Sequence, residues 1–310
     1  MSLPRRSDFA HHWSLSPDTV FLNHGSFGAT PIPVLEEQSR IRNLLERDPV
    51  RFFEREYTDL WNHSRAVLAS VLNAEKDGLA FVSNATQGVN TVLRSLKLKP
   101  GDEIIISDHT YQACWNAVDY VTQKSGARTV VVNIPFRIEG PGEIINLFMD
   151  AVTDRTVLAL IDTITSPTGT RMPFEDLTEK LQSRGVDVLL DAAHGPGIVP
   201  IDITRLAPAY CTGNCHKWIC SPKGSAFLHI REDRKDSVKP LNISHGFSFE
   251  GTAQEKFDFE FAWPGTQDPS PWLSIPKALE FMEGLVEGGW GQIMDRNRNL
   301  ALQGRNLICD

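Results

Sequence analysis

Short aliphatic runs that alternate with helix-like segments are the feature that most constrains the fold of this 310-residue chain. The runs are rich in Val, Ile and Leu and lack a polar face, as expected for strands that are buried on both sides of a sheet. They occupy residues 79–82, 103–107, 129–134, 156–162, 186–191 and 225–230. The helix-like segments between them are residues 86–96, 111–125, 142–152 and 174–184. This alternation predicts an α/β fold of three layers, in which a doubly wound, mostly parallel sheet lies between two layers of helices.

The segments on either side of this alternation have no strand pattern. Residues 1–30 show no clear period and predict an N-terminal arm, which is followed by helices over residues 34–46 and 56–72. Residues 245–268 are polar and rich in Gly and aromatic residues, so we expect neither a strand nor a helix there. We interpret them as a long functional loop or an oligomer contact. A further helix is expected over residues 269–285.

The charge and cysteine content exclude several classes of function. The chain has 31 Lys and Arg against 39 Asp and Glu, a net charge of −8, so no global positive field attracts nucleic acid or anionic lipid. Its longest aliphatic runs, such as residues 157–161, are far shorter than a membrane span, and residues 1–30 show no secretory leader pattern. The 5 cysteines are an odd, sparse set, which predicts a reducing, cytoplasmic location. The expected partners are small molecules or protein, with no nucleic acid and no membrane.

The cysteines of residues 211–220 do not predict a metal site. Cys211, Cys215 and Cys220 lie close together in the sequence. Structural zinc sites usually combine paired short spacings with a second pair elsewhere, and that second pair is absent. We interpret these cysteines as small buried residues and expect no metal.

Polar residues follow several of the predicted strands at the point where each strand ends. In open α/β sheets, ligands bind beyond the carboxyl ends of the strands. Residues 83–86 open a helix with small side chains, which is typical of a phosphate cradle; helix capping by Ser83 or Asn84 is the alternative. Residues 108–111 offer rings that can stack on a planar ligand, and residues 162–170 offer hydroxyls. Each of these two segments is otherwise an ordinary polar loop.

Asp191 and Lys217 carry the sharpest chemical signals. Asp191 ends a buried run and is followed by Ala-Ala-His, and an acid at the exit of a buried strand is costly unless a cation meets it. The alternatives are a helix cap or a hydrogen-bonded buried carboxylate. Lys217 lies between His216 and Trp218 after a short strand. Most lysines are solvated, so the His-Lys pair alone is a weak indication.

Together these segments resemble the class V aminotransferase group of pyridoxal-phosphate enzymes, the fold-type I set that includes cysteine desulfurases. The nearest likeness is to the isopenicillin N epimerase-like branch, which also contains carbon–sulfur lyases. The motifs are LNHGSFG at 22–28, SNAT at 83–86, DHTY at 108–111, TSPTG at 165–169, DAAH at 191–194, NCHKW at 214–218 and WPGT at 263–266. Their shared order is much more specific than any single motif.

The resemblance implies pyridoxal 5′-phosphate as the cofactor and an amino acid as the small-molecule substrate. It assigns Lys217 to the covalent link with the cofactor aldehyde, which requires an amine of lowered pKa. It places Asp191 opposite the pyridine nitrogen, where a carboxylate keeps that nitrogen protonated. Tyr111 is favoured over His109 as the ring-stacking group and as an acid or base.

The resemblance also implies further cofactor contacts. The residues implied to contact the ring or the phosphate are His194 and Ser166 on the ring side, and Ala85, Thr86, Asn214 and His216 on the phosphate side. Thr266 matches a family position that reaches the phosphate of the neighbouring subunit. That match implies a homodimer.

The C-terminal part departs from the family pattern. Family members continue into a smaller α/β domain that supplies a carboxylate-binding arginine, whereas this chain ends at Asp310. The helix expected from residue 292 onward resembles the connection into that domain. The expected division is therefore an arm at 1–30, a pyridoxal-phosphate-binding large domain at 31–288, and a connecting helix with the start of a truncated C-terminal domain at 289–310.

Either the chain is a truncated gene product, or other groups hold the substrate carboxylate. Asn23, His24 and Arg51 are the candidates, although a surface helix residue is the alternative for Arg51. No cysteine occurs between Cys220 and Cys309, so desulfuration through a cysteine persulfide is not expected.

The activity that the resemblance favours is epimerisation or carbon–sulfur lyase chemistry, with Lys217 or Tyr111 moving the Cα proton of the substrate. One alternative is a class V aminotransferase. Another is a cofactor-binding scaffold that has lost turnover together with its C-terminal domain. An NAD-binding Rossmann protein is disfavoured, because no G-x-G-x-x-G follows the predicted strands.

Overall fold

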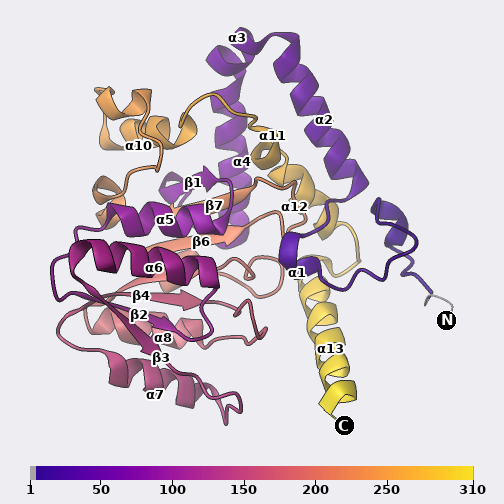
Figure 1. Cartoon of the computed structure of the whole chain (residues 1–310). Helices are drawn as coiled ribbons and strands as arrows, with labels where there is room; N and C mark the ends of the chain where they lie inside the picture. Colours follow the sequence, from indigo (N-terminus) through magenta and orange to yellow (C-terminus); the bar gives the residue numbers. More distant parts are fainter. Residues whose placement is uncertain (1–4, 310) are drawn as a thin grey trace.

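A computed structural model describes residues 5–309 of the chain, and its centre is a seven-stranded sheet in the order β1-β7-β6-β5-β4-β2-β3 (Figure 1). The strands are β1 (Leu79–Val82), β2 (Glu103–Ser107), β3 (Arg128–Val132), β4 (Thr156–Asp162), β5 (Asp187–Asp191), β6 (Tyr210–Asn214) and β7 (Ala226–Ile230). Neighbours from β6 through β3 pair in parallel, while β7 is antiparallel to both β6 and β1. The predicted mostly parallel sheet is confirmed, although β3 ends at Val132 rather than at residue 134.

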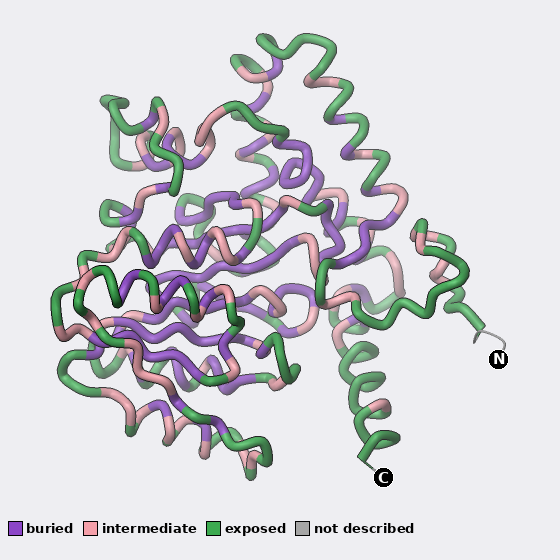
Figure 2. The backbone as a smooth tube through the Cα atoms, viewed as in Figure 1, coloured by how far each residue is buried: buried purple, intermediate pink, exposed green. Residues whose placement is uncertain are grey.

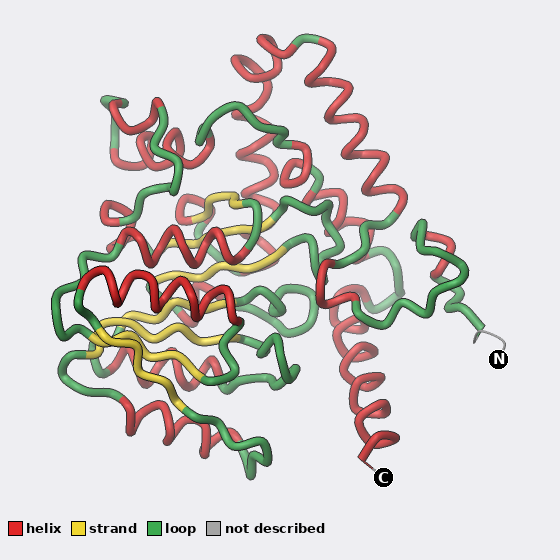
Figure 3. The backbone as a smooth tube through the Cα atoms, in the orientation of Figure 1, coloured by secondary structure: helices red, strands yellow, loops and turns green. Residues whose placement is uncertain are grey.

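Two helical layers cover the sheet, as Figure 3 shows. The helices packed against its two faces and its β1 edge are α4 (Tyr57–Leu72), α5 (Ala85–Ser95), α6 (Gln112–Ser125), α7 (Pro141–Ala151), α8 (Phe174–Ser183) and α10 (Ala253–Ala262). α12 (Ile275–Glu283) packs on α4. Because strand side chains alternate between faces, Leu189 packs in the cluster of α5 and α6, whereas Val188 and Leu190 pack in the cluster of α4, α7 and α8. Most strands are accordingly buried along nearly all of their length in Figure 2, whereas in the edge strand β3 only Val132 is buried. The predicted three layers are thereby confirmed.

The remaining helices connect or flank this core. They are α1 (His24–Phe27), α2 (Ile32–Arg47), α3 (Pro49–Arg51), the π-helical turn η2 (Phe52–Glu56), α9 (Ile203–Leu206), α11 (Ser270–Leu273) and α13 (Gly289–Cys309), with short 3-10 turns elsewhere. The helix expected over 269–285 is divided into α11 and α12. α13 extends away from the sheet in Figure 1, and its outer turns are exposed in Figure 2. Within residues 5–309, no helix combines the length and the apolar content that crossing a bilayer requires.

The expectation of no regular element over residues 245–268 is wrong, because α10 lies there. Thr252 and Glu255 form a capping box at its start, each side chain accepting the backbone N–H of the other. Phe257 and Phe261, one helical turn apart, are buried against the sheet. The sequence Phe-Asp-Phe-Glu-Phe alternates with a period of two, which conceals the helical period. The capping box was the local signal that indicated a helix.

The strand directions place several loops at one edge of the sheet. β1 runs in the same direction as β6, because both are antiparallel to the strand between them. The carboxyl ends of β1, β2, β4, β5 and β6 therefore meet at this edge. The reversed direction of β7 makes the chain leave β6 and return at the same edge, so residues 215–225 form a loop there. We call this the carboxyl edge.

Candidate active site

Lys217 lies in the loop between β6 and β7, at the carboxyl edge. Its Nζ is 3.0 Å from Nε2 of His194, which follows β5. Burial lowers the pKa of Lys217, and the charge of Asp191 and the thiol of Cys114 offset that effect only in part. A lowered pKa favours the uncharged amine, which is the state that attacks an aldehyde.

The ring of His194 lies between two side chains of that loop. The indole Nε1–H of Trp218 donates to Nδ1 of His194 over 3.3 Å, and Lys217 approaches the opposite ring nitrogen. Burial lowers the pKa of His194 to about 4, and the positive charge of Lys217 acts in the same direction. The imidazole is therefore neutral at pH 7 and carries one ring proton.

Asp191 and Asp162 form a pair of neighbouring carboxyl groups. They are register partners at the ends of β5 and β4, so their side chains lie on the same face of the sheet. Burial raises the pKa of both groups, and their mutual repulsion raises the pKa of Asp162 further. Asp191 accepts the Ala193 N–H over 2.9 Å and the Cys114 S–H over 3.4 Å. Among the described residues, the only hydrogen-bond donor to the Asp162 carboxyl group is its own backbone N–H. Asp191, which has two donors, is therefore the group that favours the charged form, and Asp162 is the group that favours the protonated form.

The first turn of α5 combines helix capping with free donors. Asn84 caps the helix, its Oδ1 accepting the Gln87 N–H over 2.9 Å, as the capping alternative predicted. The Ala85 N–H donates to Oδ1 of Asn214 over 2.9 Å, so it is already engaged. The N–H and the hydroxyl of Thr86 have no partner within residues 5–309. Thr86 therefore presents two donors at the positive end of a helix.

His216 is held by the backbone of Ser225, the residue just before β7. Its Nδ1 lies 3.0 Å from the carbonyl oxygen of Ser225, which can only accept, so Nδ1 carries the proton. Burial lowers the pKa of His216, and the nearby charges of Lys217 and Lys223 contribute. The neutral ring thus has its lone pair on Nε2, and His216 must take up a proton before it can donate to an anion.

The N-terminal arm packs directly on the backbone of the Lys217 loop. Nε2 of His24 lies 2.9 Å from the carbonyl oxygen of Lys217, and the His24 ring tilts against Trp218 at 5.1 Å between centroids. Gly28 has φ +72, and a Cβ added there would lie 1.9 Å from the carbonyl oxygen of His216. Only glycine allows so close an approach. Asn23 precedes α1, and its side chain is exposed.

Tyr111 and His109 both follow β2 at the carboxyl edge. Tyr111 is exposed, and its hydroxyl has no partner among the residues that the structure describes. His109 is half-buried, and its Nδ1 lies 3.1 Å from Oγ1 of Thr168 in the loop after β4. The fold therefore anchors His109 and leaves Tyr111 free to turn.

The structure does not bring Ser166, Thr266 or Arg51 into contact with the Lys217 group. Ser166 and Thr266 are exposed loop residues. Arg51 belongs to α3 and forms an ion pair with Glu56 at 2.8 Å. α2 separates α3 from the arm by 16 residues, which is about 24 Å of helix, and Figure 1 draws α3 at the far end of α2.

Two members of the site, Asp162 and Cys114, were not selected from the sequence. Asp162 ends an apolar run just as Asp191 does, and this shared position was a usable signal. Cys114 lies in the first turn of α6 and contacts Asp191 at the end of β5, and no local pattern indicates that contact. The other cysteines near Lys217 are buried, as predicted.

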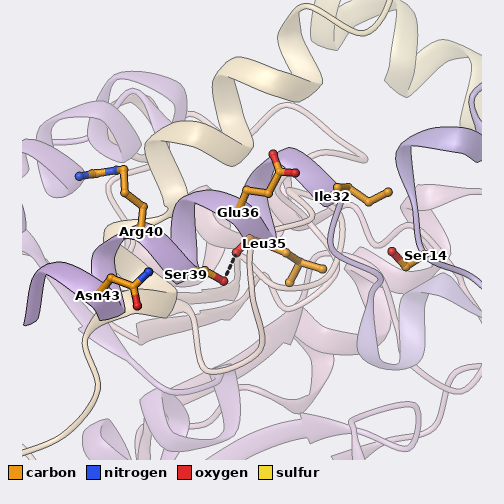
Figure 4. A pocket seen from close by; sticks show the side chains of 7 residues that line it. All are labelled: Ser14, Ile32, Leu35, Glu36, Ser39, Arg40 and Asn43. Atoms are coloured by element: carbon orange, nitrogen blue, oxygen red, sulfur yellow. Dashed lines mark hydrogen bonds between the residues drawn. The ribbon is translucent and has the colours of Figure 1, made fainter. Parts of the chain in front are cut away.

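No metal site accompanies this group in the part of the chain that the structure describes, since residues 5–309 contain no cluster of three or more His, Cys, Asp or Glu side chains suited to an ion. A separate surface hollow lies between the arm and the outer face of α2 (Figure 4). Its labelled side chains are Ser14, Ile32, Leu35, Glu36, Ser39, Arg40 and Asn43. Ser39 bonds the Leu35 carbonyl of its own helix, and Arg40 pairs with Glu37. This hollow has no reactive group comparable to the carboxyl edge.

The groups at the carboxyl edge fit the cofactor that the resemblance implies. Lys217 supplies an amine of lowered pKa for an aldehyde. Asp191 supplies a buried carboxylate for a ring nitrogen, and Thr86 supplies unpartnered donors at a helix N-terminus for a phosphate. These are the three kinds of contact that pyridoxal 5′-phosphate requires.

Known proteins match the chain over most of its length. The family described as aminotransferase class-V matches residues 36–307. Isopenicillin N epimerase of Streptomyces clavuligerus is 31% identical over 309 residues, which cover 96% of this chain and 76% of the epimerase. A probable chloroplastic L-cysteine desulfhydrase of Arabidopsis thaliana is 32% identical over 321 residues, covering 97% of this chain and 66% of the desulfhydrase.

A solved structure shares the fold. The cystine C-S lyase C-DES, in complex with its reaction product cysteine persulfide, matches with a TM-score of 0.76 at 21% identity, covering 86% of this chain and 72% of that chain. The expectations of fold-type I architecture and of the epimerase-like branch are confirmed. The chain belongs to the class V aminotransferase family, in the branch that resembles isopenicillin N epimerase, and its cofactor is pyridoxal 5′-phosphate.

Proposed function

We propose that the chain is an enzyme that acts at Cα and Cβ of an amino acid, as an epimerase or a carbon–sulfur lyase. Its similarity to both isopenicillin N epimerases and L-cysteine desulfhydrases supports this range of reactions. The observation that carries the proposal is the Lys217 amine, held 3.0 Å from a neutral His194 at the carboxyl edge.

The chain's own residues would divide the work as follows. The cofactor, when bound, supplies an electron sink for the charge that remains when Cα loses a proton. Lys217 accepts that proton at Nζ, because a lowered pKa increases the share of the amine that has a free lone pair. Asp191 would hold the ring nitrogen of the cofactor in its protonated form, because the Ala193 N–H and the Cys114 S–H favour the charged carboxylate. Tyr111 is proposed to stack on the ring and to serve as a second acid or base.

The phosphate would bind at the start of α5. Thr86 offers its N–H and hydroxyl, and His216 donates after it takes up a proton. Ala85 joins them when its N–H leaves Asn214, whose side chain otherwise holds α5 against β6. This arrangement predicts that the phosphate is bound more tightly when His216 is protonated.

The remaining assignments extend the proposal to the ring and to a second subunit. His194 and Ser166 would contact the ring hydroxyl. Thr266 would reach the phosphate bound to the other protomer of a homodimer, and its exposed position is compatible with that reach.

The substrate carboxylate needs a polar group near the arm. Asn23 is exposed and makes no capping hydrogen bond, so it is the best placed candidate within one chain. His24 has one ring nitrogen engaged by the Lys217 carbonyl. Arg51, about 24 Å away along α2, would serve only the site of a neighbouring subunit.

Proton exchange at Cα tests the proposal. Protein loaded with the cofactor is incubated in D₂O with a panel of amino acids, and ¹H NMR follows the loss of the Cα–H signal. Exchange with inversion of configuration identifies an epimerase, and release of sulfide with a keto acid identifies a lyase. Amino transfer to an added keto acid would identify an aminotransferase instead.

The control is the Lys217→Ala variant, which keeps the fold but lacks the amine. It should show no exchange and no cofactor covalently attached after borohydride reduction. Cofactor-loaded wild-type protein that exchanges no Cα proton on any amino acid would overturn the proposal in favour of a cofactor-binding scaffold.

A further inference from the structure

Trp218 makes a hydrogen bond whose direction is fixed by chemistry. An indole Nε1 carries a hydrogen and has no acceptor lone pair, so it can only donate. Its partner is Nδ1 of His194, at 3.3 Å. Nδ1 of His194 must therefore be unprotonated, and the single proton of the neutral ring must lie on Nε2.

That assignment determines the charge of Lys217. Nε2 of His194 lies 3.0 Å from Nζ, and with its proton in place it is a donor toward the lysine. A lysine ammonium has three hydrogens and no lone pair, so the N–H of a charged Lys217 would face the Nε2–H of His194 and no hydrogen bond could form. The bond forms only when Lys217 is the uncharged amine and accepts the Nε2–H. The Trp218–His194 and His194–Lys217 hydrogen bonds can thus form together only when His194 carries its proton on Nε2 and Lys217 is uncharged.

We propose that Trp218 is a positioning residue, which holds His194 in its Nε2–H tautomer and thereby keeps Lys217 as an uncharged amine before the cofactor binds. The benefit to catalysis rests on the proposed function. The tautomer and the lysine charge do not, because both are properties of the cofactor-free chain.

Other charged groups around Lys217 act in both directions. Asp191 on β5 and Cys114 on α6 favour the ammonium, and burial opposes it. The pKa of His216, its neighbour in the loop, is lowered mainly by burial, which favours a neutral ring beside Lys217. His24 of the arm contacts the Lys217 carbonyl and not its amine. Burial and the His194 bond therefore both favour the uncharged amine, against the effect of Asp191.

Trp218 also has a packing role that must be separated from its hydrogen bond. Its ring contacts His24, and a Cβ added at Gly25 would lie 3.0 Å from it. Trp218→Phe keeps an aromatic ring and removes the N–H. Trp13→Phe is the matched control, because the Trp13 indole also donates from a partly buried position, to the Ala29 carbonyl over 3.2 Å, outside the site.

Two measurements on the cofactor-free protein test the proposal. Long-range ¹H–¹⁵N NMR reads the tautomer of His194, and competitive acetylation followed by mass spectrometry reads the pKa of the Lys217 amine. We expect the Nε2–H tautomer and a reactive amine in the wild type and in Trp13→Phe. In Trp218→Phe we expect a shift toward the Nδ1–H tautomer and a pKa of Lys217 higher by about one unit, which slows acetylation about tenfold below that pKa.

An Nδ1–H tautomer in the wild type would overturn the proposal directly, even if Trp218→Phe failed to fold. An unchanged tautomer and acetylation rate in a folded Trp218→Phe would leave Trp218 with a packing role alone. Neither measurement uses substrate turnover. A chain without turnover that shows the expected tautomer would therefore contradict the proposed function and leave this inference standing.

Discussion

Two buried carboxyl groups, Asp162 and Asp191, end adjacent strands and face the same side of the sheet. Like charges repel strongly where water is excluded, so one group must keep its proton. The donors from Ala193 and Cys114 select Asp191 as the charged member. At the scale of single residues, the two carboxyl groups thus differ in protonation. Replacing Asp191 and replacing Asp162 should therefore have different effects.

Asp191→Asn should retain the cofactor and lose proton exchange. The amide has nearly the same shape but cannot hold a proton on the ring nitrogen, so we expect Cα exchange to slow by on the order of 100-fold or more. Loss of the substrate Cα–H signal in D₂O, followed by ¹H NMR, measures this rate. Asp187→Asn is the control, because Asp187 lies at the other end of β5 and pairs with Arg234. An exchange rate in Asp191→Asn equal to that of the control would refute the role of Asp191.

Asp162→Asn should stabilise the cofactor-free chain more at high pH than at low pH. The folded-state pKa of Asp162 lies above its unfolded value, so its contribution to stability is complete in acid and is lost as pH rises through the folded pKa. Asparagine does not titrate. We expect the free energy of unfolding of the variant, relative to wild type, to increase from pH 5 to pH 8 in urea titrations. A difference that stays constant with pH would contradict the raised pKa.

At the scale of elements, the reversed strand β7 and the docked arm build the carboxyl edge together. The antiparallel return of β7 places Lys217 in a loop at the ends of the parallel strands. The arm then closes on this loop through the backbone, because Gly28 permits contact with His216. This contact is made possible by the lack of a side chain at Gly28.

Gly28→Ala should release the arm while leaving the sheet folded. The left-handed φ costs about 1–2 kcal/mol for an L-residue, and the added Cβ meets the His216 carbonyl at 1.9 Å. We expect faster proteolysis within residues 5–30 and weaker cofactor binding. Gly169→Ala is the matched control, since it has φ +65 and nothing within 4 Å of the added Cβ. Equal proteolysis of residues 5–30 in the two variants would contradict the role of the Gly28–His216 contact in holding the arm.

At the scale of the whole molecule, two histidines that lie apart make the free energy of unfolding depend on pH. His194 lies at the carboxyl edge, and His229 lies within β7, its Nδ1 buried without a partner among the described residues. Burial lowers the pKa of each to about 4. Both are therefore neutral in the folded chain at pH 7 and titrate normally, near pH 6.5, when the chain unfolds.

Acid should therefore destabilise the cofactor-free chain before its carboxylates titrate. A folded-state pKa below the unfolded one gives stability that is present above pH 6.5 and is lost as pH falls toward 4. Each histidine contributes up to about 1.4 kcal/mol per pH unit, while Asp162 acts in the opposite direction. His229→Gln should therefore show a shallower loss of stability from pH 7 to pH 5 than wild type in urea titrations. Parallel pH profiles would rule out the contribution of His229.

Several whole-molecule properties stay predictions. The homodimer, the cytoplasmic location and the division at residues 31–288 and 289–310 rest on motifs and composition. The arm carries exposed apolar side chains at Leu22 and Phe27, which are compatible with a contact between protomers.

Most of the fold was predictable because its signals are local. The apolar runs marked the strands, and β1, β2 and β4 have the predicted bounds. α10 was missed because its phenylalanines alternate with a period of two while only Phe257 and Phe261 face the core. The position of a side chain on a helix depends on what the helix packs against, and that information is outside the segment.

The amino-acid sequence by itself determined the layered fold, the family and the cofactor, and it selected Lys217 and Asp191 as candidate site residues, because each follows from residue type and position along the chain. Only the tertiary structure brought together the groups that govern protonation at the site. The bond from Trp218 to His194, the Asp162 carboxyl beside Asp191, and the engagement of the Ala85 N–H join segments that are far apart in sequence. Protonation depends on burial and on hydrogen-bond partners, and both exist only once the chain has folded.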